Sequence, residues 1–195
     1  MSYLISAFSF LLEVVFSAAA TLIVLRLLAE ACRADFNNPL SQFVYRYTNP
    51  VLSPIRRIIP NWRRINTAAV LIAWLLMLLK RLLIFVLLGR MPGIVGLLLL
   101  SFADLLDFIL VFYLVLIFVW SLMSMFQVDR HHPVLRLMSS LVEPVLRPVR
   151  GKLVAAGLDF GPWVAMIVLV LLRLLVVAPL TGYGMQLALG IGSVG

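Results

Sequence analysis

Charged residues are scarce in this chain, and their scarcity decides its class. Lys, Arg, Asp and Glu make up 12% of the 195 residues, whereas apolar residues make up 64%. Soluble domains average about a quarter charged and about half apolar residues. A soluble domain of this length has no core large enough to bury so much apolar surface. Soluble enzymes, disordered chains and collagen-like fibres are therefore excluded, and the sequence predicts an integral membrane protein.

Cysteine and histidine are also rare, which limits cofactor chemistry. Cys32 is the one cysteine, so no disulfide can form within the chain. The two histidines, His131 and His132, are adjacent, and no further ligand with zinc-site spacing follows them. The sequence also lacks a phosphate-binding glycine loop, a nucleophile elbow and a metalloprotease motif. We therefore expect no enzymatic activity, no metal site and no cofactor.

Long apolar runs are what the chain has in abundance. A membrane-spanning helix needs about 20 apolar residues, and four runs reach that scale, near residues 3–29, 67–88, 94–125 and 162–178. Glu13 interrupts the first run and no Lys or Arg precedes it, so we expect a retained span and not a cleaved signal peptide. The predicted fold class is an all-α membrane protein with four transmembrane helices.

The net charge of +8 is concentrated between the predicted spans. Arginines fill the loop between spans one and two and the loop between spans three and four, whereas the two ends of the chain carry no Lys or Arg. The positive-inside rule therefore predicts cytoplasmic loops and termini on the opposite side. Basic loops beside a membrane meet anionic lipid head groups, so direct nucleic-acid binding is not expected. Arg26, near the cytoplasmic end of span one beside Glu30, is expected to extend to the head groups.

The second half of the chain repeats the first. Residues 49–56 (NPVLSPIR) match residues 143–150 (EPVLRPVR), 94 positions later. Each half consists of a span, a basic loop and a span. Residues 1–90 and 94–180 are therefore predicted to be tandem repeats of parallel orientation, followed by a short tail over 181–195.

Each basic loop is predicted to contain a short amphipathic helix. Asn38 is a suitable cap for a helix that begins at Pro39, with apolar residues following at helical spacing. This helix is expected to end near Asn49, because Pro50 follows, and its counterpart is expected over about 133–142. Such a helix either lies in the cytoplasmic interface of the membrane or docks on the protein's own spans, and the sequence leaves both alternatives open.

The repeated element resembles the YggT family, also called the YGGT-repeat or YlmG-like family. Residues 35–39, 49–60 and 143–150 carry the resemblance, which extends over nearly the whole chain. It implies a small protein of the bacterial inner membrane, here with periplasmic termini, and no assigned catalytic activity. It also implies links to osmotic-stress tolerance and potassium uptake, to cell division and envelope shape, or, in plastid relatives, to nucleoid distribution and cytochrome maturation. So varied a list suggests a scaffold or assembly factor.

Ionisable residues inside the predicted spans are the clearest site signal. Each needs a partner, because a charge near the bilayer centre is costly. From their depths we predict that Glu13 pairs with Lys80 or Arg81. We likewise predict that Asp107 pairs with Arg173, within a repeat or across the pseudo-axis. Such pairs hold spans together, mark a path for ions or protons, or face a partner protein, and all three readings stay open. The full set is Glu13, Lys80, Arg81, Asp104, Asp107 and Arg173.

Two functions from different classes follow. The first is a non-enzymatic scaffold whose two basic loops, stiffened by prolines, contact anionic lipid head groups or an unidentified membrane or cytoplasmic protein. The second is a potassium or proton channel or transporter subunit that uses the intramembrane pairs. Four spans leave little room for a pore, so the second function requires a homo-oligomer, and no broken helix is evident in mid-membrane. The loop residues singled out by the repeat are Asn49, Pro50, Pro54, Arg56, Arg57, Glu143, Pro144, Arg147, Pro148 and Arg150.

Overall fold

The protein is described here by a computed structural model that covers residues 2–35, 37–57, 59, 66–126, 132–149, 154–155 and 158–190. These residues are helical apart from turns and one antiparallel pair of two-residue strands, β1 (Val154–Ala155) and β2 (Leu158–Asp159). Four helices are long and apolar enough to cross a membrane. The predicted all-α, four-span fold class is confirmed.

The first three membrane-spanning helices begin and end close to the predicted spans. The fourth is a continuous helical column in which a π-helical segment, η1, joins two α-helices. The spanning elements are α1 (Ser2–Ala31), α3 (Thr67–Leu87), α4 (Ile94–Met125), α6 (Gly161–Leu172), η1 (Arg173–Val177) and α7 (Ala178–Leu189).

Two predicted boundaries were wrong, namely the end of the fourth span near residue 178 and the start of the tail at residue 181. The column continues past Ala178 to Leu189, so residues 181–189 belong to the helix. Glycines occur in this stretch, and a glycine in a membrane helix allows a neighbour to approach closely. A Cβ at Gly184 would lie 2.9 Å from the Leu100 side chain of α4. Packing against α4 thus extends the helix.

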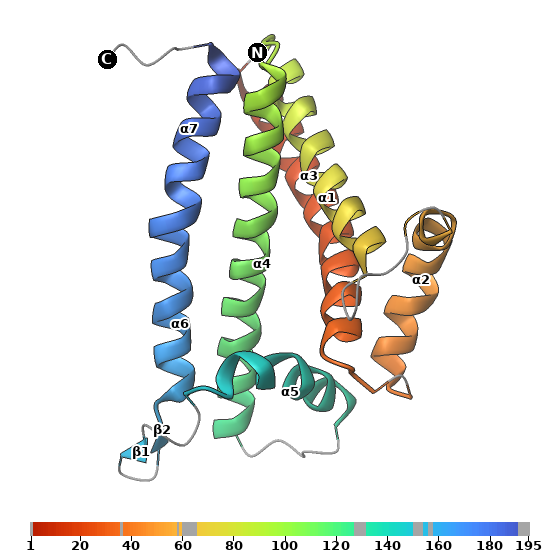
Figure 1. Ribbon diagram of the computed structural model, residues 1–195, viewed down its shortest axis with the longest axis vertical. Coiled ribbons are helices and arrows are strands. Elements are labelled where there is room, and N and C mark those ends of the chain that lie inside the picture. Colours follow the sequence, from red (N-terminus) through yellow and green to blue (C-terminus); the bar gives the residue numbers. More distant parts are fainter. Residues whose placement is uncertain are drawn as a thin grey trace.

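The spanning helices contact one another in the order α1, α3, α4 and the α6–η1–α7 column (Figure 1). α3 packs against α1 and α4, and α4 packs in turn against α6 and α7. The start of α1 and the end of α7 lie at one end of these helices, and α2 and α5 lie toward the other (Figure 1). The two connecting helices therefore share one side of the molecule, as expected for tandem repeats of parallel orientation.

The connecting helices are α2 (Pro39–Arg56) and α5 (Pro133–Leu146). The predicted cap is confirmed, because Oδ1 of Asn38 accepts a hydrogen bond from the Leu40 N–H at 2.9 Å. The predicted ends were wrong, because α2 continues through Pro50 and α5 through Pro144. Both prolines are exposed. On an exposed face, water can replace the hydrogen bond that a proline withholds from the preceding turn.

Both connecting helices dock on the spans. α2 contacts α1, α3 and α5, and it buries Val44, Thr48 and Leu52. α5 contacts α4, α1 and α6. The structure therefore supports docking on the protein's own spans. Phe43 and Tyr47 of α2 are nevertheless exposed, so much of the predicted apolar stripe faces away from the spans.

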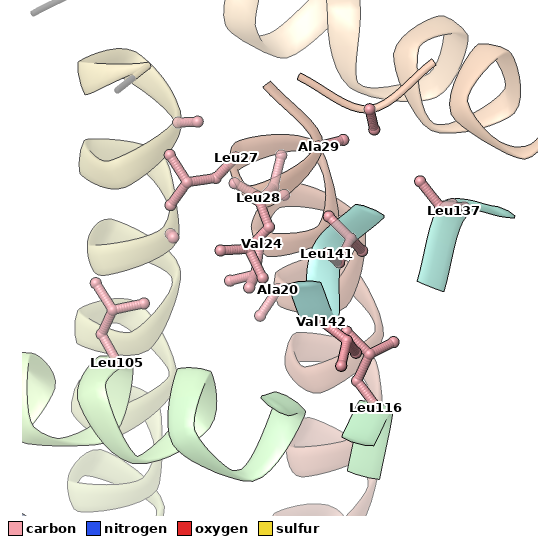
Figure 2. Close-up of a cluster of buried hydrophobic side chains, with 14 of the residues drawn as sticks. Ala20, Val24, Leu27, Leu28, Ala29, Leu105, Leu116, Leu137, Leu141 and Val142 are labelled. Atoms are coloured by element: carbon pink, nitrogen blue, oxygen red, sulfur yellow. The ribbon is translucent and has the colours of Figure 1, made fainter. Parts of the chain in front are cut away.

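The core lies where α5 closes the ends of the spans (Figure 2). Ala20 and Val24 of α1 are fully buried, as is Leu141 of α5, and Leu116 of α4 belongs to the same cluster. Because α1 belongs to the first repeat and α4 and α5 to the second, this cluster joins the two repeats. Burial of such side chains contributes roughly 1.5–3 kcal/mol each in water, and less where lipid replaces water as the alternative environment.

Candidate functional site

Glu13 of α1 and Lys80 of α3 form the first intramembrane ion pair. Nζ of Lys80 lies 3.0 Å from Oε1 of Glu13, and the Lys80 side chain is 11% exposed against 53% for Glu13. The hydroxyl of Ser17, one turn along α1, donates a weaker hydrogen bond to the same carboxylate at 3.4 Å. The Lys80 ammonium is therefore an enclosed charge that Glu13 neutralises.

Arg81 of α3 and Asp104 of α4 form the second pair, which joins the two repeats. Nε of Arg81 donates to Oδ2 of Asp104 at 2.7 Å, and Nη2 of the same guanidinium contacts Oδ1. The two side chains are 21% and 14% exposed. Two parallel hydrogen bonds fix the orientation of both groups. The sequence offered Arg81 as an alternative partner of Glu13, and it did not identify a partner for Asp104.

Asp107 of α4 and Arg173 form the third pair. Nε and Nη2 of Arg173 donate to the two carboxylate oxygens of Asp107 at 2.7 and 3.0 Å. Arg173 is also the first residue of the π-helical segment η1. The fourth span is not broken here, but its π-helical turn is an irregularity that the sequence analysis did not predict. The segment itself contains neither proline nor glycine, but Pro179 follows it within the same helical column and lacks an N–H, which was an available sequence signal. Such π-helical turns occur often at functional sites.

A pocket of about 590 Å³ lies beside this third pair. Asp104, Asp107 and Arg173 line it together with Thr181 and apolar side chains of the fourth span. The pocket places two carboxylates and a guanidinium next to a space large enough for water or a small ion. It is the feature of the described structure that most favours a conduction path.

The three pairs together form what we call the ion-pair ladder. Each pair stands at a different contact between neighbouring spans, namely α1–α3, α3–α4 and α4–η1. Asp107 lies about 20 Å along α4 from Ile94 at the helical rise, well inside a hydrocarbon layer of about 30 Å. Acids and bases balance within the ladder. Its members are Glu13–Lys80, Arg81–Asp104 and Asp107–Arg173.

A second polar cluster surrounds Arg26, at the α2 end of α1. Arg26 is 1% exposed, and its Nε donates to Oε1 of Glu30 at 2.7 Å. Its Nη1 donates to the side-chain oxygens of Thr48 and Asn49 at 3.1 Å each. The guanidinium carbon lies 3.6 Å from the ring centroid of Tyr45. The prediction that Arg26 extends to the head groups was wrong, because α2 folds over it and supplies acceptors.

Glu30 is shared by further donors in this cluster. Nη2 of Arg56 lies 3.0 Å from Oε2 of Glu30, and Nδ2 of Asn66 donates to the same oxygen at 2.8 Å. Burial raises the pKa of the nearby Tyr45 phenol to about 12, and the negative charge of Glu30 acts in the same direction. Sequence reasoning missed this cluster, although the spacing of Arg26 and Glu30 by one helical turn in an apolar run was a signal.

The predicted loop residues occupy different environments. Asn49 and Arg56 belong to the Arg26 cluster. Arg57 and Arg147 are the exposed residues directly after α2 and α5. Pro50 and Pro54 lie within α2, and Glu143 and Pro144 lie within α5. Pro148 lies in the turn that follows α5. Arg150 and His131 lie outside the described residues.

No group of three or more His, Cys, Asp or Glu side chains that fits a metal ion occurs in the described part of the chain. The candidate site therefore consists of paired charges, which suit adhesion between helices or ion contact.

Comparison with known proteins identifies the family. A family model described as CCB3/YggT matches residues 5–87 and 99–180. "Uncharacterized protein YggT" of Escherichia coli (strain K12) is 32% identical over 186 residues, which are 94% of this chain and 96% of the relative. "Uncharacterized protein PA0392" of Pseudomonas aeruginosa is 33% identical over 187 residues, 92% and 94% of the two chains. No solved structure matches. Two matched segments and relatives similar over nearly their whole length show that this membrane protein belongs to the CCB3/YggT family.

Proposed function

We propose that the protein is a non-enzymatic membrane scaffold. In this proposal the ion-pair ladder fixes the four spans relative to one another. The spans in turn hold α2 and α5 at one end as a platform for anionic lipid head groups and for a protein partner. The observation that carries the proposal is the placement of the ladder, with one ion pair at each contact between neighbouring spans.

The chemistry of the ladder supports adhesion. A buried ion pair adds little net stability, but removing one partner leaves a bare charge and is strongly destabilising. Paired charges therefore select one arrangement of helices over others. The two-pronged contacts of Arg81 and Arg173 restrict both the depth and the rotation of the helices that they join.

The platform supports contact with a membrane surface. Arg46, Arg57 and Arg147 are exposed on or beside α2 and α5. Phe43 and Tyr47 are exposed next to Arg46, with ring centroids 4.5 Å apart. Arginines beside aromatic side chains suit a lipid–water interface. The arginines of the loops support a platform on the cytoplasmic side of a bacterial inner membrane, with periplasmic termini. The proposed role is in osmotic-stress tolerance and envelope or cell-division homeostasis, and the family resemblance supports it.

A potassium or proton channel or transporter subunit is the second candidate. The pocket beside Asp107 and Arg173, next to the π-helical segment, favours it. Intramembrane carboxylates also mark ion and proton paths in many transporters. This candidate requires several copies of the chain to enclose a pore.

Flux through liposomes separates the two candidates. Purified protein is reconstituted, and potassium and proton movement are followed under imposed gradients, with Asp107→Asn/Arg173→Gln beside the wild type. The scaffold proposal predicts no flux above that of empty liposomes. Flux in the wild type that disappears in the folded double variant would make the protein a transporter and would overturn the scaffold proposal.

A further inference from the structure

One face of α2 contains a polar pocket separate from the ladder. Its volume is about 360 Å³, and Arg46, Asn49, Pro50, Ser53 and Arg56 line it. These positions recur at three- and four-residue steps, so they share one side of the helix. The sequence had assigned some of these residues to a stiff loop, but the helix continues through Pro50 and gathers them.

The pocket offers the groups that a phosphate needs. Two guanidinium groups can meet phosphate oxygens in pairs, and the amide of Asn49 and the hydroxyl of Ser53 add neutral donors. Arg56 is already oriented, because its Nη2 lies 3.0 Å from a carboxylate oxygen of Glu30. The Nε of Arg56 is buried and has no hydrogen-bond partner among the described residues.

The surrounding charge also favours an anion. Arg26 and Arg56 both contact the single carboxylate of Glu30. These two arginines and one carboxylate together carry a net charge of about +1. Arg46 is exposed at the pocket and adds a second positive charge. An anion bound beside Arg46 and Arg56 would balance this excess, which gives the pocket its preference for negative ligands.

The second repeat does not reproduce the pocket. The positions that correspond to Asn49 and Ser53 are Glu143 and Arg147. A carboxylate at 143 opposes an anion, and Trp120 stands where the first repeat has Arg26. Arginines that serve only to orient loops need no such difference between repeats. The divergence therefore confines this set of groups to the first repeat.

An apolar stripe runs along α2 next to the pocket. Leu40, Phe43, Tyr47 and Val51 are exposed along one side of the helix. Tyr47 directly follows Arg46, so a molecule with a phosphate in the pocket can lay hydrocarbon along the stripe. A lipid has that combination of parts, although free phosphate fits the polar groups equally well.

We propose that Arg46, Asn49, Ser53 and Arg56 form a binding site for a phosphate group, carried on an anionic lipid head group or free in solution. The proposal rests on the platform function and deepens it, because it names the ligand class and the residues that bind it. Its test measures ligand binding and does not involve the ladder or ion flux, so its failure can be told apart from failure of the scaffold proposal.

The test uses the full chain purified in a neutral, phosphate-free detergent. In one arm, inorganic phosphate is titrated and followed by ³¹P NMR. In the other, native mass spectrometry compares retention of phosphatidylglycerol with that of phosphatidylcholine. The variants are Arg46→Gln and Ser53→Ala. The matched control is Arg90→Gln, which removes the same charge at an exposed position after α3, away from α2 and α5. Melting temperatures verify that each variant is folded.

The proposal predicts that Arg46→Gln weakens binding of at least one phosphate probe by about tenfold or more, because a hydrogen-bonded charge is lost. Arg90→Gln should leave binding unchanged. Binding of phosphatidylglycerol alone identifies a lipid head group, and binding of inorganic phosphate identifies a site for the free ion as well. No binding of either probe, equal retention of the two lipids without phosphate binding, or equal losses in Arg46→Gln and Arg90→Gln would overturn it.

Discussion

Two arginines at the platform end of the molecule show how burial decides what an ion pair contributes. Arg26 and Arg136 each place a nitrogen 2.7 Å from a carboxylate oxygen, of Glu30 and Asp35 respectively. The Arg26 side chain is 1% exposed and that of Arg136 is 58% exposed. Solvent screens the second pair, whereas the first is enclosed by α2. Equal distances therefore do not imply equal contributions to stability.

Replacing Arg26 by alanine should lower the free energy of unfolding by about 3 kcal/mol or more, because Thr48, Asn49 and part of Glu30 lose an enclosed charged donor. Arg136→Ala is the matched control and should cost less than about 1 kcal/mol. Denaturant unfolding in detergent measures both changes. Similar losses in the two variants would show that the enclosure of Arg26 has no energetic consequence.

Tyr45 gives the cluster a measurable pH dependence. Its pKa is raised from 10.0 to about 12, chiefly by burial. Because the folded state raises this pKa, the associated stabilisation is complete below about pH 10 and is lost as the pH rises through about 12. The absorbance difference between wild type and Tyr45→Phe should therefore report phenolate formation near pH 12. A midpoint near 10 would contradict the burial of this phenol.

The sequence predicted the members of the ladder because a charge inside an apolar run is conspicuous and requires a partner. Matching depths also brought Glu13 to Lys80 and Asp107 to Arg173, and the structure joins both pairs. The contact between Arg81 and Asp104 was not foreseen, since it depends on which helices are neighbours. The acceptors of Arg26 come from a different helix for the same reason, so depth along one span could not identify them.

Glycine controls how closely the elements approach. A Cβ added at Gly96 of α4 would lie 2.1 Å from the backbone nitrogen of Ala188 of α7. That nitrogen is main-chain, so the helices must move apart to admit a methyl group. Gly182, by contrast, has nothing within 4 Å of an added Cβ. Small residues at such crossings are a common means of packing membrane helices.

Gly96→Ala should therefore destabilise the contact between α4 and α7, by about 1–3 kcal/mol as overpacking does in protein cores. Gly182→Ala makes the same chemical change in open space and should be neutral or slightly stabilising. Melting temperatures of the two variants in one detergent compare them directly. A Gly96→Ala protein as stable as the wild type would mean that α7 does not pack against α4 in this way.

Element boundaries were predictable where hydropathy changes sharply and not where packing sets them. The limits of α4 agree with its apolar run. The ends of α2 and α5 were misjudged because exposed prolines do not stop a helix that is held by its buried face. The end of α7 was misjudged because Gly184 allows close contact with Leu100 of α4.

At the scale of the whole molecule, the ladder and the platform explain different parts of the fold. The ladder joins α1, α3, α4 and the fourth span through paired charges. α5 and α2 then cover the end of the spans that lies away from the start of α1 (Figure 1). Apolar side chains from both repeats meet there (Figure 2). The tandem repeat was visible in the sequence, but the two repeats contribute different chemistry, since the Arg26 cluster belongs to the first repeat and Trp120 replaces Arg26 in the second.

The central claim is that the ladder holds neighbouring spans together, and a double-mutant cycle on the pair between the repeats tests it most directly. Arg81→Gln, Asp104→Asn and the double variant are unfolded reversibly in one detergent. Each single change should lower the free energy of unfolding by about 3–5 kcal/mol, because it leaves one buried charge bare. The double variant should lose less than either single variant, because it leaves no bare charge, so the coupling should reach about 3 kcal/mol or more. Single losses that simply add would contradict the claim that these two charges stabilise the protein as a pair.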